Sequence, residues 1–232
     1  MEQVRTLLGI DEAGRGCVLG PMVFGAFLST ADVESELRAA GVRDSKRLSK
    51  KKRAALATRF TEAASGLSES KQWGRHEVVS IPPSRLDSGS LNEIGKEVIV
   101  ELTLKFRPDV LILDAPVPPR GIPKYREQIL DQLAQAGFDT SKLELVAENG
   151  ADDTFPCCSA ASILAKTFRD RELASLEEAV GRPIGSGYPS DPKTVSFLRE
   201  LWQRDRVWPP FVRTKWETAR RIVAESSQAR LL

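Results

Sequence analysis

Residues 4–21, VRTLLGIDEAGRGCVLGP, decide the fold of this chain. An apolar run leads directly into two adjacent carboxylates, Asp11 and Glu12, and a glycine-flanked arginine, Arg15, follows them. Such a run is typical of a buried strand, and the acids that end it would emerge at an edge of the sheet. A carboxylate there is costly unless its charge is compensated, most often by a divalent cation. The alternative is an ordinary strand followed by a polar hairpin turn.

A second apolar run also ends in an acid. Residues 109–114, DVLILD, follow a long amphipathic helix predicted at 91–106. This strand can lie parallel to the first one, which we expect at the centre of the sheet, through a right-handed crossover. Asp11 and Asp114 would then be neighbours. Two carboxylates about 4 Å apart repel by roughly 4 kcal/mol, and all-oxygen ligands favour magnesium or manganese over zinc.

The other elements complete an α/β pattern. We expect one mixed sheet flanked by helices, with residues 1–180 as its domain and residues 181–232 as a helical extension packed on it. The remaining strands are predicted at 22–29, 72–80 and 143–147, and the remaining helices at 32–40, 50–64, 123–136 and 154–180.

The helix predicted at 154–180 carries polar residues on one face. Ser162, Lys166 and Asp170 recur at helical spacing, so their side chains share that face. Asp170 could therefore complete the predicted carboxylate cluster. The alternative is that Lys166 and Asp170 form a surface ion pair worth under about 0.5 kcal/mol.

The composition is that of a globular protein and excludes several classes. The chain has 232 residues, of which 41% are hydrophobic and 28% charged, a mixture that supports a sizeable core. No apolar stretch approaches the roughly 20 residues of a membrane span. Three cysteines, two of them adjacent, are no disulfide framework, so we expect a reducing, cytoplasmic compartment. The single histidine, His76, excludes zinc sites built on several histidines.

Basic residues crowd one segment. Seven of the eleven residues at 43–53 are Lys or Arg, and four of them open the predicted helix at 50–64. Positive charge at a helix start is unfavourable for the helix dipole. The run is either a solvated helix face or a contact surface for a phosphate backbone.

Five motifs, taken together and in order, resemble type 2 ribonuclease H (ribonuclease HII). They are GIDEAGRG at 9–16, DSK at 44–46, Asp114 after its apolar strand, SAASILAKTFRD at 159–170 and GYP at 187–189. The tracts GSGYPSDP at 185–192 and FVRTKW at 211–216 are similar to the archaeal and eukaryotic branch of that family. The resemblance spans nearly the whole chain.

The resemblance implies a ribonuclease H-like mixed five-stranded sheet with a C-terminal helical cap. It implies hydrolysis of RNA in RNA/DNA hybrids and cutting 5′ of single ribonucleotides embedded in DNA, as in ribonucleotide excision repair. Two Mg²⁺ or Mn²⁺ ions would act with substrate bound, leaving a 3′-hydroxyl and a 5′-phosphate. The metal-binding and catalytic carboxylates would be Asp11, Glu12, Asp114 and Asp170. The substrate-binding residues would be Gly14, Arg15, Gly16, Lys46, Lys166 and Tyr188.

One departure from the family pattern concerns the segment after the last predicted strand. The branch that the chain resembles usually has a lysine before the Ala-Asp pair at 151–152, whereas this chain has Gly150. Loss of a lysine there could weaken substrate binding or shift metal preference. The predicted carboxylates are untouched, so we expect activity.

Two other functions compete with this one. An actin-like ATPase or sugar kinase also places an acid on its first strand beside a glycine turn, but such proteins need a duplicated domain and a longer chain. A non-catalytic nucleic-acid-binding protein could keep the fold and the basic helix. We expect a monomer without membrane contacts. Residues 228–232, QARLL, could dock weakly on a sliding clamp, because they lack the aromatic anchor that clamp-binding peptides use.

Overall fold

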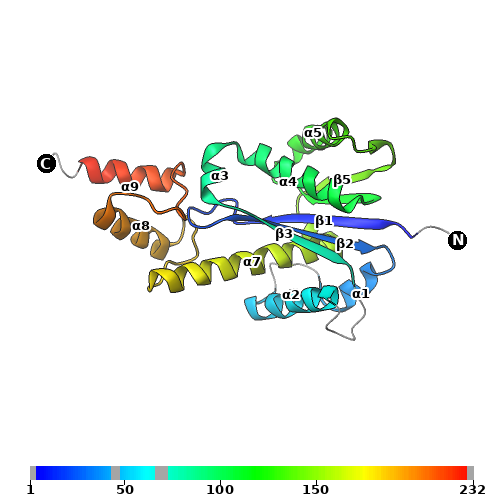
Figure 1. Cartoon of the computed structure of the whole chain (residues 1–232), viewed down its shortest axis with the longest axis horizontal. Helices are drawn as coiled ribbons and strands as arrows, with labels where there is room; N and C mark the ends of the chain where they lie inside the picture. Colours follow the sequence, from blue (N-terminus) through cyan, green and yellow to red (C-terminus); the bar gives the residue numbers. More distant parts are fainter. Residues whose placement is uncertain (1–3, 43–47, 66–72, 229–232) are drawn as a thin grey trace. The chain divides into compact units, whose positions relative to one another are not determined.

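The computed structural model describes residues 4–42, 48–65 and 73–228 (Figure 1). The chain divides into two compact units. The first comprises Met1–Ala13, Phe24–Val79 and Asn92–Thr167, and the second comprises Gly14–Val23, Ser80–Leu91 and Phe168–Leu232. The boundary between residues 180 and 181 stays a prediction.

A five-stranded sheet organises the first unit. Its strands are β1 (Thr6–Ala13), β2 (Met22–Thr30), β3 (Arg75–Ile81), β4 (Val110–Asp114) and β5 (Glu144–Glu148). They lie in the order β3-β2-β1-β4-β5, so the first strand is central, as predicted. β4 pairs in parallel with β1 and with β5. The carboxyl ends of these parallel strands therefore meet at one edge of the sheet.

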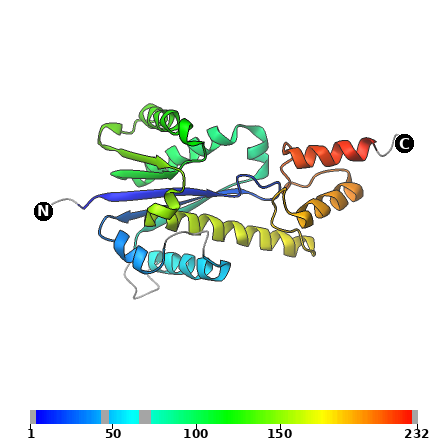
Figure 2. The same ribbon diagram turned by 180° about the vertical axis from the view of Figure 1, so that it is seen from behind.

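Helices cover both faces of this sheet. In Figure 1 α1 (Glu34–Ala39), α2 (Lys50–Ser65) and the beginning of α7 (Pro156–Val180) lie on one face. Figure 2, the view from behind, shows α4 (Leu91–Phe106) and α5 (Ile122–Gln135) on the other face. The predicted mixed sheet flanked by helices is confirmed. No helix within the described residues is long and apolar enough to cross a membrane.

Two glycines let α7 approach the sheet closely. A Cβ at Gly9 on β1 would stand 2.3 Å from the backbone nitrogen of Cys158, and one at Gly25 on β2 would stand 2.1 Å from the carbonyl oxygen of Ala161. Both distances are far shorter than any real contact of this kind. The backbone of α7 thus rests directly on β1 and β2, and this close packing fixes the side chains that α7 presents to the first strand.

The helix predicted at 154–180 is found as α7, Pro156–Val180. A one-turn helix, α6 (Ala151–Thr154), precedes it, and Phe155 between the two is extended (φ −107°, ψ 117°). The break has a local cause, because Pro156 has no backbone N–H and disfavours the helical conformation of the residue before it. α6 is therefore free to leave the axis of α7 and to carry Asp152 on its own turn.

The second unit has its own apolar core. This unit contains α3 (Pro83–Ser88) and also α8 (Pro192–Asp205) and α9 (Glu217–Gln228), which are the predicted C-terminal helices. Val18 and Leu19, from the loop after β1, pack with Phe197 and Leu198 of α8 in this core. The loop that follows the first strand is thereby built into the C-terminal part of the protein.

Candidate metal centre

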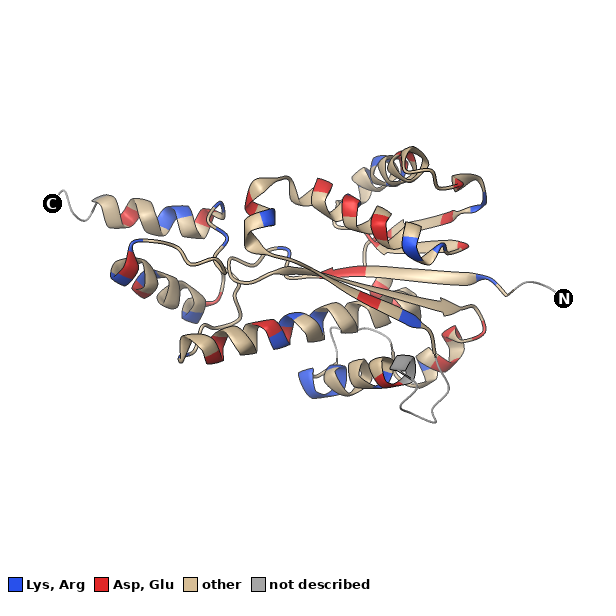
Figure 3. Ribbon diagram, viewed as in Figure 1, with Lys and Arg blue, Asp and Glu red and all other residues tan. Residues whose placement is uncertain are grey.

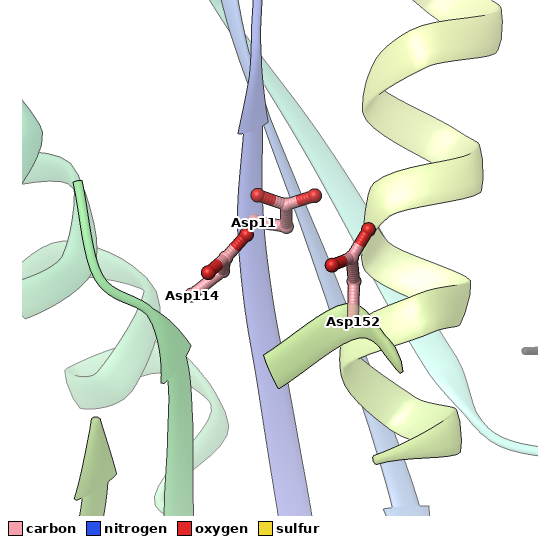
Figure 4. A group of neighbouring side chains, drawn as sticks. All are labelled: Asp11, Asp114 and Asp152. Carbon is pink, nitrogen blue, oxygen red and sulfur yellow. The ribbon is translucent and has the colours of Figure 1, made fainter. Parts of the chain in front are cut away.

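Three aspartates from separate elements of the first unit point toward one another (Figure 4). Asp11 comes from β1, Asp114 from the end of β4 and Asp152 from α6. Each offers a carboxylate oxygen, and these oxygens all lie within 4.8 Å of one another. Asp11 is 6% exposed and Asp152 1% exposed. A triad of acids this buried requires compensation by positive charge.

The strand register brings the first two aspartates together. Ile10 of β1 pairs with Leu113 of β4, so the next residue along each strand is an aspartate. Because the two strands are parallel, both acids leave the sheet at the same edge. The prediction that Asp11 and Asp114 are neighbours is confirmed.

The segment after β5 supplies the third aspartate and supports the second. Gly150 has a positive φ of +77°, which a residue with a side chain rarely adopts. Its N–H donates to Asp114 Oδ1 at 2.7 Å, and the amide of Asn149 donates to the carbonyls of Ala115 and Val117. Gly150, the position at which the resemblance led us to expect a lysine, thus holds Asp114 through its backbone.

A lysine and a serine from α7 join the triad. Lys166 Nζ donates to Ser162 Oγ at 2.7 Å and lies 3.5 Å from Asp152 Oδ2. Ser162 Oγ in turn donates to Asp152 Oδ2 at 3.3 Å. Lys166 therefore pairs with a buried carboxylate, rather than serving only as the surface partner of Asp170 that its spacing suggested. One lysine against three acids leaves the group with excess negative charge.

The electrostatics of Asp11 match a cation site. Burial is the largest cause that raises the pKa of Asp11 to about 7, and the nearby Asp114 and Asp152 carboxylates raise it further. The Ser162 hydroxyl and the Lys166 ammonium oppose this shift. A bound divalent cation would favour the ionised form of all three acids. Hard oxygen ligands without histidine or thiolate suit Mg²⁺ or Mn²⁺, so the residues fit the cofactor that the sequence predicts.

The other predicted site residues are not members of this group. Glu12 follows Asp11 on β1, and its N–H donates to Asp11 Oδ1 at 2.6 Å. Asp170 lies on α7 in the second unit, and its role as a fourth ligand stays a prediction. Lys46 lies outside the described residues. His76, on β3, has a pKa lowered by burial, and within the described part of the chain it belongs to no group of metal-ligating side chains.

Asp152 is the site residue that the sequence pattern did not identify. It follows the fifth strand by only a few residues, while Asp11 lies near the end of the first strand and Asp114 ends the fourth. The missing information was the parallel pairing of β5 with β4, which brings this carboxyl end to the same edge.

The raised pKa of Asp11 has a consequence for stability. Its pKa is about 7 in the folded protein, against an ordinary 3.8, so ionising it costs folding free energy as the pH rises. In metal-free buffer the free energy of unfolding of the parent should fall by about 3 kcal/mol between pH 5 and pH 8, relative to that of Asp11→Asn. Paired thermal melts in EDTA measure this difference. A lower melting temperature for Asp11→Asn at pH 8 would contradict it and make Asp11 a structural acid.

The predicted substrate-binding residues Gly14 and Tyr188 lie in the second unit. Gly14 has a φ of +79°, and a Cβ there would stand 2.5 Å from Nε of Arg169. The N–H groups of Val18 and Leu19 both donate to the carbonyl of Gly187, at 2.8 and 3.3 Å. The glycine loop and the Gly-Tyr-Pro turn are thus tied together. Tyr188 is 40% exposed, which leaves its ring available to a ligand.

Comparisons with known proteins agree with this geometry. The family model described as ribonuclease HII matches residues 8–219. A ribonuclease HII from Thermococcus onnurineus is 40% identical over 93% of this chain and 89% of its own length.

Two solved structures are also similar. The structure of ribonuclease H2 from Pyrococcus horikoshii has a TM-score of 0.80 and 34% identity, covering 96% of this chain and 99% of that one. A PCNA:RNase HII complex from Archaeoglobus fulgidus has a TM-score of 0.76 and 36% identity, covering 93% and 96%. The carboxylate triad, the sheet order and these matches lead to one conclusion: the chain belongs to the ribonuclease HII family of metal-dependent endonucleases.

Proposed function

We propose that the protein hydrolyses the RNA strand of RNA/DNA hybrids and cuts on the 5′ side of single ribonucleotides embedded in duplex DNA. The observation that carries this proposal is the triad Asp11, Asp114 and Asp152, two of them buried, in a member of this family. The intact triad favours a catalyst over a non-catalytic binding protein of the same fold. The family match leaves no basis for an actin-like ATPase or sugar kinase.

The triad would hold Mg²⁺ or Mn²⁺, with Glu12 and Asp170 as the further predicted ligands. When bound there, two such cations would supply a nucleophile at neutral pH and stabilise the leaving 3′-oxygen. The products would be a 3′-hydroxyl and a 5′-phosphate. Lys166, whose Nζ lies 3.5 Å from Asp152 Oδ2, would contact a phosphate oxygen once cations offset the negative charge of the triad. No histidine base is required, which suits a chain whose only histidine is His76.

Recognition of the ribonucleotide would rest on its 2′-hydroxyl, the group that DNA lacks. Backbone groups at Gly14, Arg15 and Gly16 can approach a sugar closely, because a glycine has no side chain to hold it away. Tyr188 would pack its exposed ring on the neighbouring sugar. Lys46, the other predicted phosphate contact, lies outside the described residues.

We propose that the protein acts as a cytoplasmic monomer in ribonucleotide excision repair. Its three cysteines, Cys17, Cys157 and Cys158, are buried and free, as expected in a reducing compartment.

The Archaeoglobus fulgidus relative has been solved with PCNA, which supports clamp docking as a second property of this chain. The tail at 228–232 would make that contact weakly, since it has no aromatic residue, and residues 229–232 lie outside the described residues.

A single cleavage gel tests the proposed function. The protein is incubated with duplex DNA that carries one ribonucleotide, with and without Mg²⁺ or Mn²⁺, and the cut is mapped against an all-DNA duplex. We expect cleavage only with the cation and only 5′ of the ribonucleotide. Cleavage of the all-DNA duplex, or none with either cation, would refute the proposal.

The basic start of α2 should contact the phosphate backbone. α2 opens with Lys50, Lys51, Lys52 and Arg53 and has no acid in its first turn (Figure 3). Lys51 and Lys52 are exposed. Their double substitution by Gln should weaken duplex binding and reduce the salt slope by about one per lost phosphate contact. Turnover at saturating substrate should change little.

The matched control for this experiment is on α5. Lys124 and Arg126 are also exposed basic residues of the first unit, and α5 covers the face of the sheet opposite to α2. Their double substitution by Gln removes the same charge and should leave the salt slope unchanged. Equal slopes for both double variants would mean that the start of α2 is only a solvated face.

A further inference from the structure

A fully buried arginine lies beneath the glycine loop. Arg213, between α8 and α9, is 0% exposed. Its guanidinium donates to three carbonyl oxygens of one loop: Gly14 at 2.7 Å, Arg15 at 2.9 Å and Gly20 at 3.0 Å. All of these residues belong to the second unit. One side chain thus ties together both ends of the loop that follows the first strand.

The backbone around Arg213 holds the side chain in place. Its own N–H donates to the carbonyl of Val18 at 2.9 Å, and the N–H of Gly20 donates to the carbonyl of Phe211 at 2.9 Å. The guanidinium lies 4.8 Å from the ring centroid of Trp216. The segment at 211–216 and the loop at 14–20 are therefore one hydrogen-bonded structure, with the guanidinium at its centre.

These hydrogen bonds determine which way the loop amides point. In a trans peptide the C=O and the following N–H lie in one plane and point in opposite directions. The carbonyls of Gly14 and Arg15 face the buried guanidinium. The N–H groups of Arg15 and Gly16 must then point away from it, toward the outer side of the loop, where Gly16 is exposed.

A second buried arginine supports the same loop. Arg169, 6% exposed, donates to the sulfur of Cys17 at 2.8 Å and to the carbonyl of Ser186 at 2.9 Å. Its side chain occupies the space that a Cβ at Gly14 would need. Hydrogen bonds from buried guanidinium groups thus support the loop in addition to apolar packing. Burying a guanidinium costs several kcal/mol unless it is fully hydrogen-bonded.

We propose that Arg213 is a positioning residue for ribonucleotide recognition: it holds the Gly14 and Arg15 carbonyls inward so that the Arg15 and Gly16 amides face the sugar of the substrate. This inference rests on the proposed function. A lysine keeps the charge at this position but has no planar fork of donors to span three carbonyls. The amides of an Arg213→Lys variant should lose their fixed direction while the duplex-binding surface keeps its charge.

The test compares two affinities in each protein. Binding of a duplex with one embedded ribonucleotide and of the same all-DNA duplex is measured by fluorescence anisotropy, with Ca²⁺ in place of Mg²⁺ and gels confirming uncut strands. The parent should prefer the ribonucleotide. Arg213→Lys should lower that preference about tenfold or more, because the amides no longer point at the 2′-hydroxyl, while affinity for all-DNA duplex stays within about twofold. An unchanged preference would overturn the inference.

A matched control comes from the same unit. Arg182 pairs with the acid Glu200 and, as Arg213 does with Trp216, lies over an aromatic ring, Phe197, so its guanidinium is bound outside the loop at 14–20. Arg182→Lys should keep the parent's preference. A parent that shows no preference would instead refute the proposed function itself, so the two failures are distinguishable.

A measurement on the parent covers the case in which Arg213→Lys does not fold. In amide NMR spectra, the Arg15 and Gly16 resonances should shift when the ribonucleotide duplex is added and should shift far less with the all-DNA duplex. If neither amide responds selectively to the ribonucleotide, the proposed role of Arg213 is wrong.

Discussion

Asp152→Asn should reduce cleavage at an embedded ribonucleotide by about a thousandfold or more, because it removes one anionic ligand from a three-carboxylate site. The variant should still fold, since Asn keeps the oxygen that accepts from Ser162. In metal-free buffer it should be at least as stable as the parent, because a like-charge repulsion is relieved. Steady-state turnover in Mg²⁺ and thermal melts in EDTA check both statements.

The neighbouring acid is the matched control. Asp153 lies on the same turn, α6, and is exposed. Asp153→Asn removes the same charge one residue away and should retain nearly full activity. If both variants lose activity equally, the effect belongs to α6 as a whole and not to the carboxylate that points at Asp11 and Asp114.

The variant Asp170→Asn tests whether Asp170 is a fourth metal ligand. Asp170 is predicted from the family motif and the helical spacing, but it is not part of the group that Asp152 completes. A loss as large as that of Asp152→Asn would add Asp170 to the ligand set. A loss of cleavage activity below about tenfold would mean that acids of the first unit hold the metal without Asp170.

Tyr188→Ala should depress cutting at a single embedded ribonucleotide by about a hundredfold or more, far more than it weakens duplex affinity. The ring is 40% exposed and lies 5.1 Å from the guanidinium of Arg169, which holds it in one place. Without the ring the scissile phosphate is misplaced, and small misplacements are costly in rate. Parent-like cutting by Tyr188→Ala would mean that Tyr188 only anchors its turn.

Two further substitutions separate the roles of the ring and the hydroxyl. Burial and the neighbouring Cys17 sulfur raise the pKa of the Tyr188 hydroxyl, so Cys17 is the group in the protein through which the hydroxyl could act. Tyr188→Phe should retain most activity if ring packing dominates. If Tyr188→Phe loses much of its cleavage activity, the variant Cys17→Ala tests whether the hydroxyl acts through Cys17. Equal losses of activity in the two variants would indicate that Cys17 tethers the ring. A smaller loss for Cys17→Ala would indicate that the hydroxyl contacts the substrate.

The elements that carry strong periodic signals were predictable from the sequence. The two apolar runs that end in Asp11 and Asp114 predict two neighbouring parallel strands, and the structure confirms this pairing. The helix at 91–106 is found with the predicted bounds. In each case the local pattern and the tertiary contacts favour the same conformation.

The contributions of short or distant segments were not predictable. Asp152 sits on a single turn whose direction depends on Gly150 and on the break at Pro156, and neither has a periodic signal. The contact of Arg213 with the glycine loop spans almost the whole chain and depends on how the C-terminal segment folds back on that loop. Tertiary structure alone brings these residues together.

Binding of Mn²⁺ to the protein without nucleic acid tests the central claim, that Asp11, Asp114 and Asp152 hold the cation on which cleavage depends. The electron paramagnetic resonance signal of free Mn²⁺ is followed as parent, Asp152→Asn or Asp153→Asn protein is added. The parent and Asp153→Asn should bind the ion, and Asp152→Asn should bind it more than about tenfold more weakly. Parent-like Mn²⁺ binding by Asp152→Asn would contradict the claim.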